Sequence, residues 1–552
     1  MMRSVWRLWP LFAALAAYGA TVAIMLSVSV RQNQGHLIYT YDDAYIHMAM
    51  AKNFARHGVW GVTRHEFASA SSSPLWRLLL AVAFKLLGEH DVIPLLLNVL
   101  ACILTLVVAY RFLEAHLQRA FPVLAGLLLL IFAAPLPSLT LAGMEHSLHT
   151  LLALLFACLS AEFLSLERLS SRQLATLLVL APVLALVRYE GLFLVGAVAL
   201  LFILRGKVGM ALGLGASGFL FVTIYGIVAL RQGWYFLPNS LLLKGALPEL
   251  TSLGGAAEFL GKAAVRRVCS NPYILVLSLL SLLAIVYQGR NREKAWKSPI
   301  LWSNASFMIA VLLHMQFVGQ GWAYRYEAYL VSLGVVVITA AGGELLSGEL
   351  ALGFQRDRLP QYLAAGILAL LVGHALGERS LPILLKTSQA TTNIYEQQYQ
   401  MGLFLHRFYE GQSVAANDIG AISYLADIRL LDLEGLGSLK PATLRMKKAF
   451  NAAQVRALTA AERTSIAIVY EGWFQGILDD WSKVGEWKIR NRVVAAEDTV
   501  SFWAVDPAQK ESLIRNLQAF AGQLPATVLQ SGEYTQGIPP AAPLVGTATT
   551  QP

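Results

Sequence analysis

The residues best suited to chemistry lie in the first polar connection of the chain, between residues 39 and 76. Asp42 and Asp43 stand next to each other at the start of a helical pattern, and His47 follows Asp43 by one helical turn. One of two adjacent carboxylates can act as a general base near neutral pH, because each hinders ionisation of the other. The simpler interpretation is that an Asp caps the helix. As the base, Asp43 is our first choice and Asp42 our second.

The same connection predicts two short amphipathic helices. The first would lie flat at a membrane surface, with an apolar stripe opposite a broad polar face. Gly58 would end it, and a small polar run at 68–73 leads into Ser-Pro-Leu-Trp, which ends at Trp76. The apolar stretch 74–88 is interrupted by charge, so it fits a second interfacial helix better than a membrane span. The stripe comprises Ala44, Met48, Ala51 and Ala55, and the polar face comprises Asp43, His47, Asn53, Arg56 and His57.

Further ionisable residues interrupt the apolar segments that follow. Glu145 and His149 are one helical turn apart and could contribute to a metal site, although zinc sites use three or more protein ligands. A divalent metal is therefore an alternative, and the residue pattern requires no cofactor. Arg188 and Glu190 stand in an apolar run, where ionisable groups are costly and commonly functional. They could equally be a mutually satisfied pair.

Two cations stand beside aromatic residues in polar connections. Lys244 follows Trp234 and Tyr235, and Arg325 lies beside Tyr326. Aromatic residues at such places are commonly interfacial anchors. The cations suit a different role, because a lipid-linked phosphate needs positive charge and Arg can bind it through two parallel hydrogen bonds.

The composition indicates what kind of scaffold holds these residues. The chain has 552 residues, of which 56% are hydrophobic and 14% charged, and its mean hydropathy is +0.55. An ordinary soluble domain carries about 25% charged residues, so the composition disfavours a soluble enzyme. The net charge of +9 is spread in short clusters between apolar runs, which indicates membrane topology and no nucleic-acid partner. The three cysteines have no paired spacing, so neither disulfides nor a zinc site is predicted.

Apolar runs predict a polytopic helical membrane protein with about 11 spans, since a spanning helix needs about 20 apolar residues. Lys and Arg gather in alternate connections, which marks those as cytoplasmic. We therefore expect a bacterial inner (plasma) membrane protein with a cytoplasmic N-terminus, an exported first loop at 31–90 and an exported C-terminal part. The expected spans are 8–30, 91–110, 121–141, 147–165, 174–187, 191–204, 209–230, 272–288, 299–318, 327–343 and 361–377.

The character of the chain changes after residue 377, where the long apolar runs stop. We expect a transmembrane part at 1–377, an exported α/β domain at 378–522 and a disordered tail at 523–552, which is rich in Pro, Thr, Gln and Gly. The expected helices of the domain are 391–410 and 507–520, and the expected strands are 412–416, 428–433, 465–470 and 500–505.

Taken in order, these motifs resemble the GT-C glycosyltransferases. Asp42-Asp43 followed by Ala-aromatic-Ile, then Asn53 to Gly58, Glu66 and Ser-Pro-Leu-Trp, is similar to their first periplasmic loop. The mycobacterial terminal arabinofuranosyltransferase (AftB-like) group and its bacterial relatives are the branch it resembles. The chain departs from the arabinosyl-transferring pattern at Met48 and at 70–72. Later similar segments are AGMEHSLHTLL (142–152), LVRYEGLFL (186–194), LPNSLLLK (237–244), WAYRYEAYL (322–330) and NDIGAISYLADIRLLDLEGLGS (417–438).

The resemblance implies inverting transfer of a sugar from a polyprenyl-phosphate donor to an extracytoplasmic glycan or lipid acceptor, with membrane lipids around the helices. It places the catalytic Asp in the pair at 42 and 43. The donor or substrate would be held by residues at the similar segments, namely Arg325, Lys244, His47, Glu145, Arg188, Glu190 and Trp76. Two rival functions stand beside it: a transporter or flippase of lipid-linked glycans, and a non-catalytic scaffold whose exported domain binds a partner. A transporter would be expected to carry charges near the middle of its spans, whereas these charges lie near their ends.

Overall fold

The computed structural model describes residues 2–117, 119–244, 264–290, 295–318, 325–350 and 359–536. The chain divides into two compact units. The first comprises Met1–Thr40 and Ser69–Ser388, and the second comprises Tyr41–Ala68 and Gln389–Pro552. The division differs from the expected one in two respects. The boundary lies at Ser388/Gln389 instead of 377/378, within one continuous helix, and the loop segment 41–68 clusters with the C-terminal part because its helix packs on a helix of that part.

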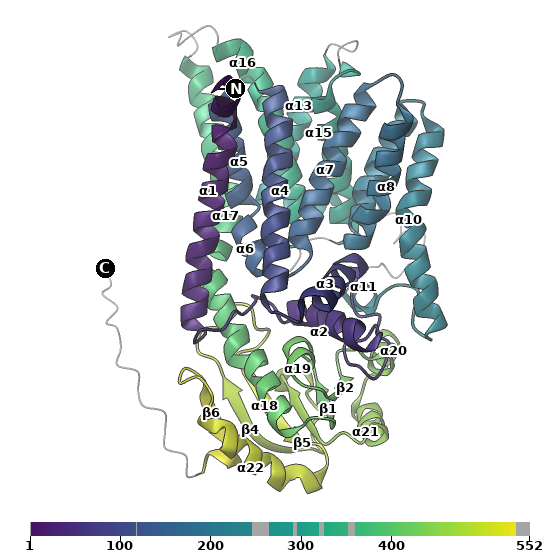
Figure 1. The fold of residues 1–552 in the computed structure, drawn as a ribbon, viewed down its shortest axis with the longest axis vertical. Coiled ribbons are helices and arrows are strands. Elements are labelled where there is room, and N and C mark those ends of the chain that lie inside the picture. Colours follow the sequence, from purple (N-terminus) through teal and green to yellow (C-terminus); the bar gives the residue numbers. More distant parts are fainter. Residues whose placement is uncertain are drawn as a thin grey trace, which may run out of the picture. The chain divides into compact units, whose positions relative to one another are not determined.

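The first unit is built of helices. In Figure 1 its long helices run side by side. All eleven segments expected to span a membrane are helical. The expected span 121–141 is broken into two helices, because Pro135 lacks the N–H that a continuous helix needs. The helices are α1 (Met2–Gln32), α3 (Pro74–Leu87), α4 (Val92–His116), α5 (Ala120–Ala133), α6 (Leu136–Leu141), α7 (His146–Ser165), α8 (Ser171–Val187), α9 (Gly191–Leu204), α10 (Val208–Arg231), α11 (Asn239–Lys244), α13 (Pro272–Gly289), α15 (Pro299–Phe317), α16 (Ala328–Leu350) and α17 (Leu359–Ile394).

The lengths and surfaces of these helices fit a bilayer. Within the described ranges, six helices are long and apolar enough to cross a membrane, in α1, α4, α7, α10, α13 and α15. Large apolar side chains such as Phe121, Leu212 and Leu283 are more than 60% exposed. A water-soluble protein does not leave so many large apolar side chains in contact with water. The chain is a multi-pass membrane protein.

The second unit contains a six-stranded mixed sheet with the order β2-β1-β3-β5-β4-β6. Strand β1 pairs in parallel with β2 and β3, whereas β5, β4 and β6 complete the sheet in antiparallel pairs. The strands are β1 (Ser413–Ala416), β2 (Arg429–Asp432), β3 (Ile466–Val469), β4 (Ser482–Lys488), β5 (Thr499–Ala504) and β6 (Leu529–Gly532). The helices are α2 (Asp42–His57), α18 (Gln400–Phe408), α19 (Gly420–Leu425), α20 (Leu439–Met446), α21 (Ala452–Ala461) and α22 (Lys510–Ala521), with a π-helical turn η3 (Tyr395–Tyr399) and short 3-10 turns η4 (Glu471–Trp473), η5 (Pro507–Gln509) and η6 (Glu533–Thr535).

Alternating side chains bury both faces of this sheet, as the period of two in a strand requires. On one face Val414, Ile466 and Phe502 pack with Phe404 of α18 and Phe520 of α22. On the other face Ala415, Ala467 and Trp503 pack with Val455 and Leu458 of α21. The helices on the two faces hold the parallel strand ends in fixed positions.

Four expected strands are confirmed as β1, β2, β3 and β5, and both expected helices of the domain are confirmed. Strand β4 escaped prediction because a register shift between Lys483 and Gly485 breaks its alternation. The expectation of disorder from residue 523 is wrong for 524–536. Strand β6 pairs with β4 there, and Val528 and Tyr534 are buried, so a few apolar residues anchor a mostly polar segment. Residues 537–552 lie outside the described residues.

Candidate functional site

Helix α2 carries the expected catalytic carboxylates in its first turn. The residue before it, Tyr41, is extended and supplies no side-chain cap. The helix ends at Gly58, whose φ of 69° is the left-handed conformation that glycine adopts readily, and whose N–H donates to the carbonyl of Phe54. Because Asp42 and Asp43 lie in the first turn, they stand at the end of the helix where the dipole favours negative charge.

The buried face of α2 is wider than the expected apolar stripe. His47 and Asn53, which we expected on the broad polar face, are 3% and 5% exposed. Asn53 donates from Nδ2 to the carbonyls of Gly61 and Val62, at 3.2 and 2.9 Å. These bonds close the turn after the helix, so Asn53 has a structural role that the helical pattern did not indicate.

Asp42 caps a different helix from its own. Its Oδ2 accepts a hydrogen bond from the N–H of Gly420 at 2.7 Å, and its Oδ1 accepts one from the N–H of Ala421 at 2.8 Å. Both N–H groups belong to the first turn of α19 and have no partner within that helix. Residue 420 must be glycine for this approach, because a Cβ there would lie 2.0 Å from the Asp42 carbonyl oxygen. The interpretation of Asp42 as a cap of its own helix is therefore wrong.

A second contact holds α2 on α19 further along. The Lys52 ammonium donates to the carbonyl of Tyr424 and lies 5.2 Å from the centre of the Tyr424 ring. The ring of Tyr45 lies 6.0 Å from the same ring. Polar contacts at the start and near the end of α19 thus fix the orientation of α2 within the second unit.

Asp418, two residues before Gly420, belongs to a buried network. Its Oδ2 lies 2.6 Å from the Tyr470 hydroxyl and 2.6 Å from Nε2 of Gln398. The Tyr470 hydroxyl also lies 2.8 Å from Oε1 of Gln397. The two glutamines are consecutive residues of the π-helical turn η3, a turn of a kind often found at functional sites. The strand pattern located Tyr470 at the end of β3, but no sequence signal predicted the glutamines.

Burial and mutual repulsion perturb the carboxylates in this region. Burial raises the pKa of Asp42 to about 8, and the charge of Asp418 acts in the same direction, whereas the hydrogen bonds from Ala421 and Gly420 lower it. Burial likewise raises the pKa of Asp418, against the hydrogen bonds from Tyr470 and Gln398. Ionisation of either carboxyl group hinders ionisation of the other, so their titrations are linked.

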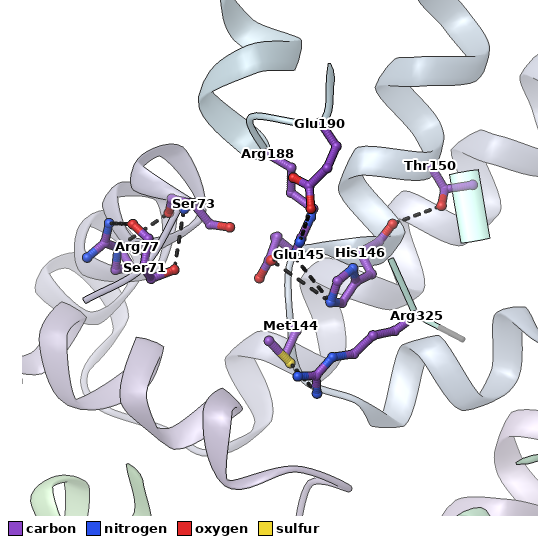
Figure 2. Close-up of polar contacts among 10 residues, drawn as sticks. All are labelled: Ser71, Ser73, Arg77, Met144, Glu145, His146, Thr150, Arg188, Glu190 and Arg325. Atoms are coloured by element: carbon purple, nitrogen blue, oxygen red, sulfur yellow. Dashed lines mark hydrogen bonds and ion pairs between the residues drawn. The ribbon is translucent and has the colours of Figure 1, made fainter. Parts of the chain in front are cut away.

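The first unit contains a separate cluster of buried charges, shown in Figure 2. Glu145 immediately precedes α7, and Arg188 and Glu190 lie between α8 and α9. The Arg188 guanidinium forms an ion pair with Glu145 and a second one with Glu190 at 2.5 Å. The expected pairing of Arg188 with Glu190 is present, and Glu145 joins it. Because all three side chains are at most 6% exposed, each charge depends on its partners.

Tyr326 connects this cluster to Arg325. The Arg188 guanidinium lies 4.8 Å from the centre of the Tyr326 ring, and the Arg325 guanidinium lies 5.4 Å from it. Arg325 is 5% exposed, and its Nη1 lies 3.6 Å from the sulfur of Met144. The ring of His146 stacks on Tyr326 with centroids 5.8 Å apart. The Tyr326 ring thus lies next to both arginines, and one of them, Arg188, also forms ion pairs with two carboxylates.

The other predicted site residues have simpler surroundings. Trp76 is buried in α3, and its neighbour Arg77 donates from Nη2 to the carbonyl of Ser71 at 2.8 Å. Lys244 ends α11, but its side chain lies outside the described residues. His149 lies against the ring of Tyr329, with centroids 4.5 Å apart. Within the described ranges, no group of three or more His, Cys, Asp or Glu is arranged to hold a metal ion.

One buried group in the first unit was missed at the sequence level. Glu327 accepts from the Tyr273 hydroxyl at 2.9 Å, and Arg379 lies 4.0 Å from the same carboxylate. Arg379 also donates to the carbonyl of Ala133 at 2.6 Å. An Arg within an apolar helical pattern was the available signal, because such a charge needs a buried partner.

Comparison with known proteins places the fold. Two crystal structures of ArnT from Cupriavidus metallidurans, one bound to undecaprenyl phosphate and one in the apo state, align with TM-scores of 0.50 and 0.51 at 12% identity. The alignments cover 89% and 90% of this chain, and 98% and 99% of the ArnT chain. The chain shares its fold with ArnT. At 12% identity this similarity establishes the shared fold, and membership of the GT-C superfamily belongs to the proposal below.

Other comparisons add less. Archaeal oligosaccharyltransferase AglB from Archaeoglobus fulgidus, in complex with an inhibitory peptide and a dolichol-phosphate, aligns with a TM-score of 0.45 at 11% identity, over 94% of this chain and 76% of that chain. Residues 392–503 match a family model described as a domain of unknown function (DUF8728). No curated protein matches the sequence.

Proposed function

We propose that this protein is an inverting GT-C glycosyltransferase that moves a sugar from a polyprenyl-phosphate donor to a cell-envelope glycan or lipid acceptor. The observation that carries the proposal is the fold shared with ArnT over nearly the whole of both chains, together with the undecaprenyl phosphate held in one ArnT structure. A lipid-linked donor explains why the reaction needs a membrane scaffold. The first-loop motifs favour the arabinofuranosyltransferase-like branch of the superfamily.

Asp43 is the proposed general base. In an inverting transfer the acceptor oxygen forms a bond to the anomeric carbon while the bond from that carbon to the phosphate oxygen breaks. The lipid phosphate leaves with the bonding electron pair, and the base takes the acceptor's hydroxyl proton. Asp42 is less suited to this task, because both of its oxygens already accept backbone N–H bonds. His47, one turn after Asp43 on α2, is proposed to orient the base or the acceptor.

Arg325 is the proposed main contact for the donor phosphate. A guanidinium presents paired N–H donors that match phosphate geometry. Arg188 is already compensated by Glu145 and Glu190, so we assign that trio to shaping the site around Tyr326. Lys244 is a second proposed phosphate contact, and Trp76 a proposed substrate contact. No step in this scheme requires a metal ion. A divalent ion stays an alternative, which is tested by measuring sugar transfer after a chelator has removed metal ions.

We place the protein in a bacterial inner membrane with about eleven spans. The N-terminus is assigned to the cytoplasm and the C-terminal α/β domain to the outside, because the Lys and Arg residues are asymmetrically distributed. Labelling of a single cysteine by a membrane-impermeant reagent tests this orientation. We expect Glu66→Cys to be labelled from outside and Lys294→Cys to be protected, and the opposite pattern would reverse the assignment.

The function is tested with purified protein and labelled polyprenyl-phosphate sugars that include hexoses, amino sugars and pentofuranoses. We expect at least one donor to release polyprenyl phosphate in an acceptor-dependent reaction. Movement of an intact lipid-linked glycan across a vesicle membrane without release would instead support a flippase. Neither release nor movement would support a scaffold. Mass spectrometry of the lipid that copurifies with the protein would narrow the choice of donors.

A further inference from the structure

The network around Asp418 lies where α/β sheets usually bind ligands. In the order β2-β1-β3-β5-β4, the connection leaving β1 runs to β2 on one side, and the connection leaving the neighbouring parallel strand β3 runs toward β4 on the other side. Such a topological switch point leaves a crevice at the carboxyl ends of the strands. Asn417 and Asp418 follow β1 there, Tyr470 follows β3, and the Tyr470 N–H donates to Oδ1 of Asn417 at 2.8 Å. In this protein, Asp42 of α2 lies at that position, bound to Gly420 and Ala421.

The ionisable side chains that interact at this point all become negative when they ionise. Asp42, Asp43 and Asp418 act on one another, and Tyr470 is the further titratable group that acts on Asp418. Of the cationic residues of α2, Lys52 contacts Tyr424 near the far end of α19, and Arg56 lies in the last turn of α2. Tyr45 and His47, the remaining titratable groups in the first half of α2, are both buried. Two partly buried carboxylates in contact with one short segment do not both ionise readily.

Counting protons around Tyr470 indicates which carboxyl group is neutral. The Tyr470 hydroxyl has one hydrogen, yet its oxygen lies 2.6 Å from Asp418 Oδ2 and 2.8 Å from Gln397 Oε1. Its third contact, Nε2 of Gln398 at 2.9 Å, can only donate to it. The first two contacts are hydrogen bonds only if Asp418 carries a proton and donates it to the Tyr470 oxygen, which in turn donates to Gln397. The orientation of the Gln397 amide is set independently. Its Nε2 faces the carbonyl of Glu497 at 3.4 Å, and its Oε1 faces Nε2 of Gln398 at 3.0 Å.

Asp42 has the opposite environment. Each of its oxygens accepts a backbone N–H, and two such bonds favour the anion. Of the two carboxyl groups, Asp418 therefore binds a proton more readily than Asp42. Resting on the function proposed above, we propose that Asp418 is a neutral carboxylic acid at physiological pH and acts as a positioning residue. By remaining uncharged it allows the Asp42 carboxylate to hold α19, and so fixes α2 and the orientation of Asp43.

The proton links this arrangement to pH in a defined direction. A carboxyl group with a raised pKa keeps a proton in the folded protein that it would lose in the unfolded chain. From the ordinary carboxyl range up to the raised pKa of Asp418, the folded state therefore binds more protons, and its stability falls as the pH rises. Above that window, Asp418 becomes charged beside Asp42, and the contact of α2 with α19 is weakened.

Infrared difference spectra of the full-length protein in detergent, recorded between about pH 6 and about pH 9, test the protonation directly and need no substrate. We expect a protonated-carboxyl C=O band at the lower pH that disappears at the higher pH. Asp418→Asn should abolish this band. Its amide N–H can donate to the Tyr470 oxygen in place of the acid proton, so the variant is expected to fold. The exposed Asp506→Asn is the matched control and should leave the band unchanged. A band that persists in Asp418→Asn would overturn the assignment. The assignment would also be overturned if Asp42→Asn removed the band while Asp418→Asn did not.

The positioning role is tested by the pH profile of sugar transfer. In the wild type we expect transfer to fall on the alkaline side as Asp418 loses its proton. Asp418→Asn should remove that alkaline fall, because the amide cannot ionise, whereas Asp418→Ala should lower transfer at every pH. An unchanged alkaline limb in Asp418→Asn would contradict the positioning role. Since the infrared result does not depend on activity, failure of the proposed function and failure of this inference are distinguishable.

Discussion

Replacing Asp43 by asparagine is expected to lower the rate of sugar transfer by about two to four orders of magnitude, the usual contribution of a general base. The side chain keeps its size, so folding and donor affinity should be preserved. The measurement is the initial rate of transfer at saturating donor, beside a separate donor-binding isotherm. Asp506→Asn removes an exposed carboxylate from the same unit and should transfer at the wild-type rate.

Asp42→Asn should have the smaller effect on transfer and a distinct cause. An asparagine can accept only one of the two N–H bonds from Gly420 and Ala421, and it points an amide nitrogen at the other. Leaving one buried N–H unsatisfied costs about 1–3 kcal/mol, so this variant should lose stability as well as rate. A larger rate loss in Asp42→Asn than in Asp43→Asn would exchange the two roles. Near-wild-type transfer in both variants and in the double variant would remove this loop from the chemistry.

Arg188→Ala is expected to destabilise the protein by about 3–5 kcal/mol, because it leaves two buried carboxylates without their counter-charge. Glu145 and Glu190 are 1% and 5% exposed, so water cannot replace the guanidinium. Reversible unfolding of the detergent-solubilised protein measures this loss. The exposed Arg168→Ala should change the stability by no more than about 0.5 kcal/mol.

A compensated variant separates charge from packing in the same cluster. Arg188→Met combined with Glu145→Gln and Glu190→Gln removes all three charges while retaining most of the volume. It should be clearly more stable than Arg188→Ala, since replacing a whole buried ion cluster is far less costly than breaking it. If Arg188→Ala unfolds like the wild type, the three side chains are not the mutually dependent cluster described above.

Much of the fold could be predicted from the pattern of apolar residues. The helices of the first unit follow from long apolar runs, and strands β1 and β3 follow from short apolar runs bounded by polar residues. The limits appear at Pro135, where hydropathy continues but the backbone hydrogen bonds cannot, and at β6, where pairing with β4 orders a mostly polar segment. Hydropathy registers neither the missing N–H of a proline nor the pairing of one strand with another.

The candidate site could be predicted residue by residue but not contact by contact. The types and spacing marked Asp42 and Arg188, which the structure places in polar contacts, and Asp43, whose role stays a prediction. The partner of Asp42 is Gly420, 378 positions away, and that contact depends on the packing of two helices that no local pattern specifies. The neutral state proposed for Asp418 could not be predicted from the sequence either, since it depends on which hydrogen-bond partners surround Tyr470 in the folded protein.

The most direct test of the account is the anomeric configuration of the transferred sugar, read by NMR on product made from a labelled polyprenyl-phosphate donor of known configuration. We expect the sugar to appear on the acceptor hydroxyl with inverted configuration, with one polyprenyl phosphate released for each sugar transferred, and both to be lost in Asp43→Asn. Retention of configuration would require a covalent sugar intermediate and would contradict a base role for Asp43. Failure of every donor and acceptor combination to yield product would contradict the assignment of this protein as a glycosyltransferase.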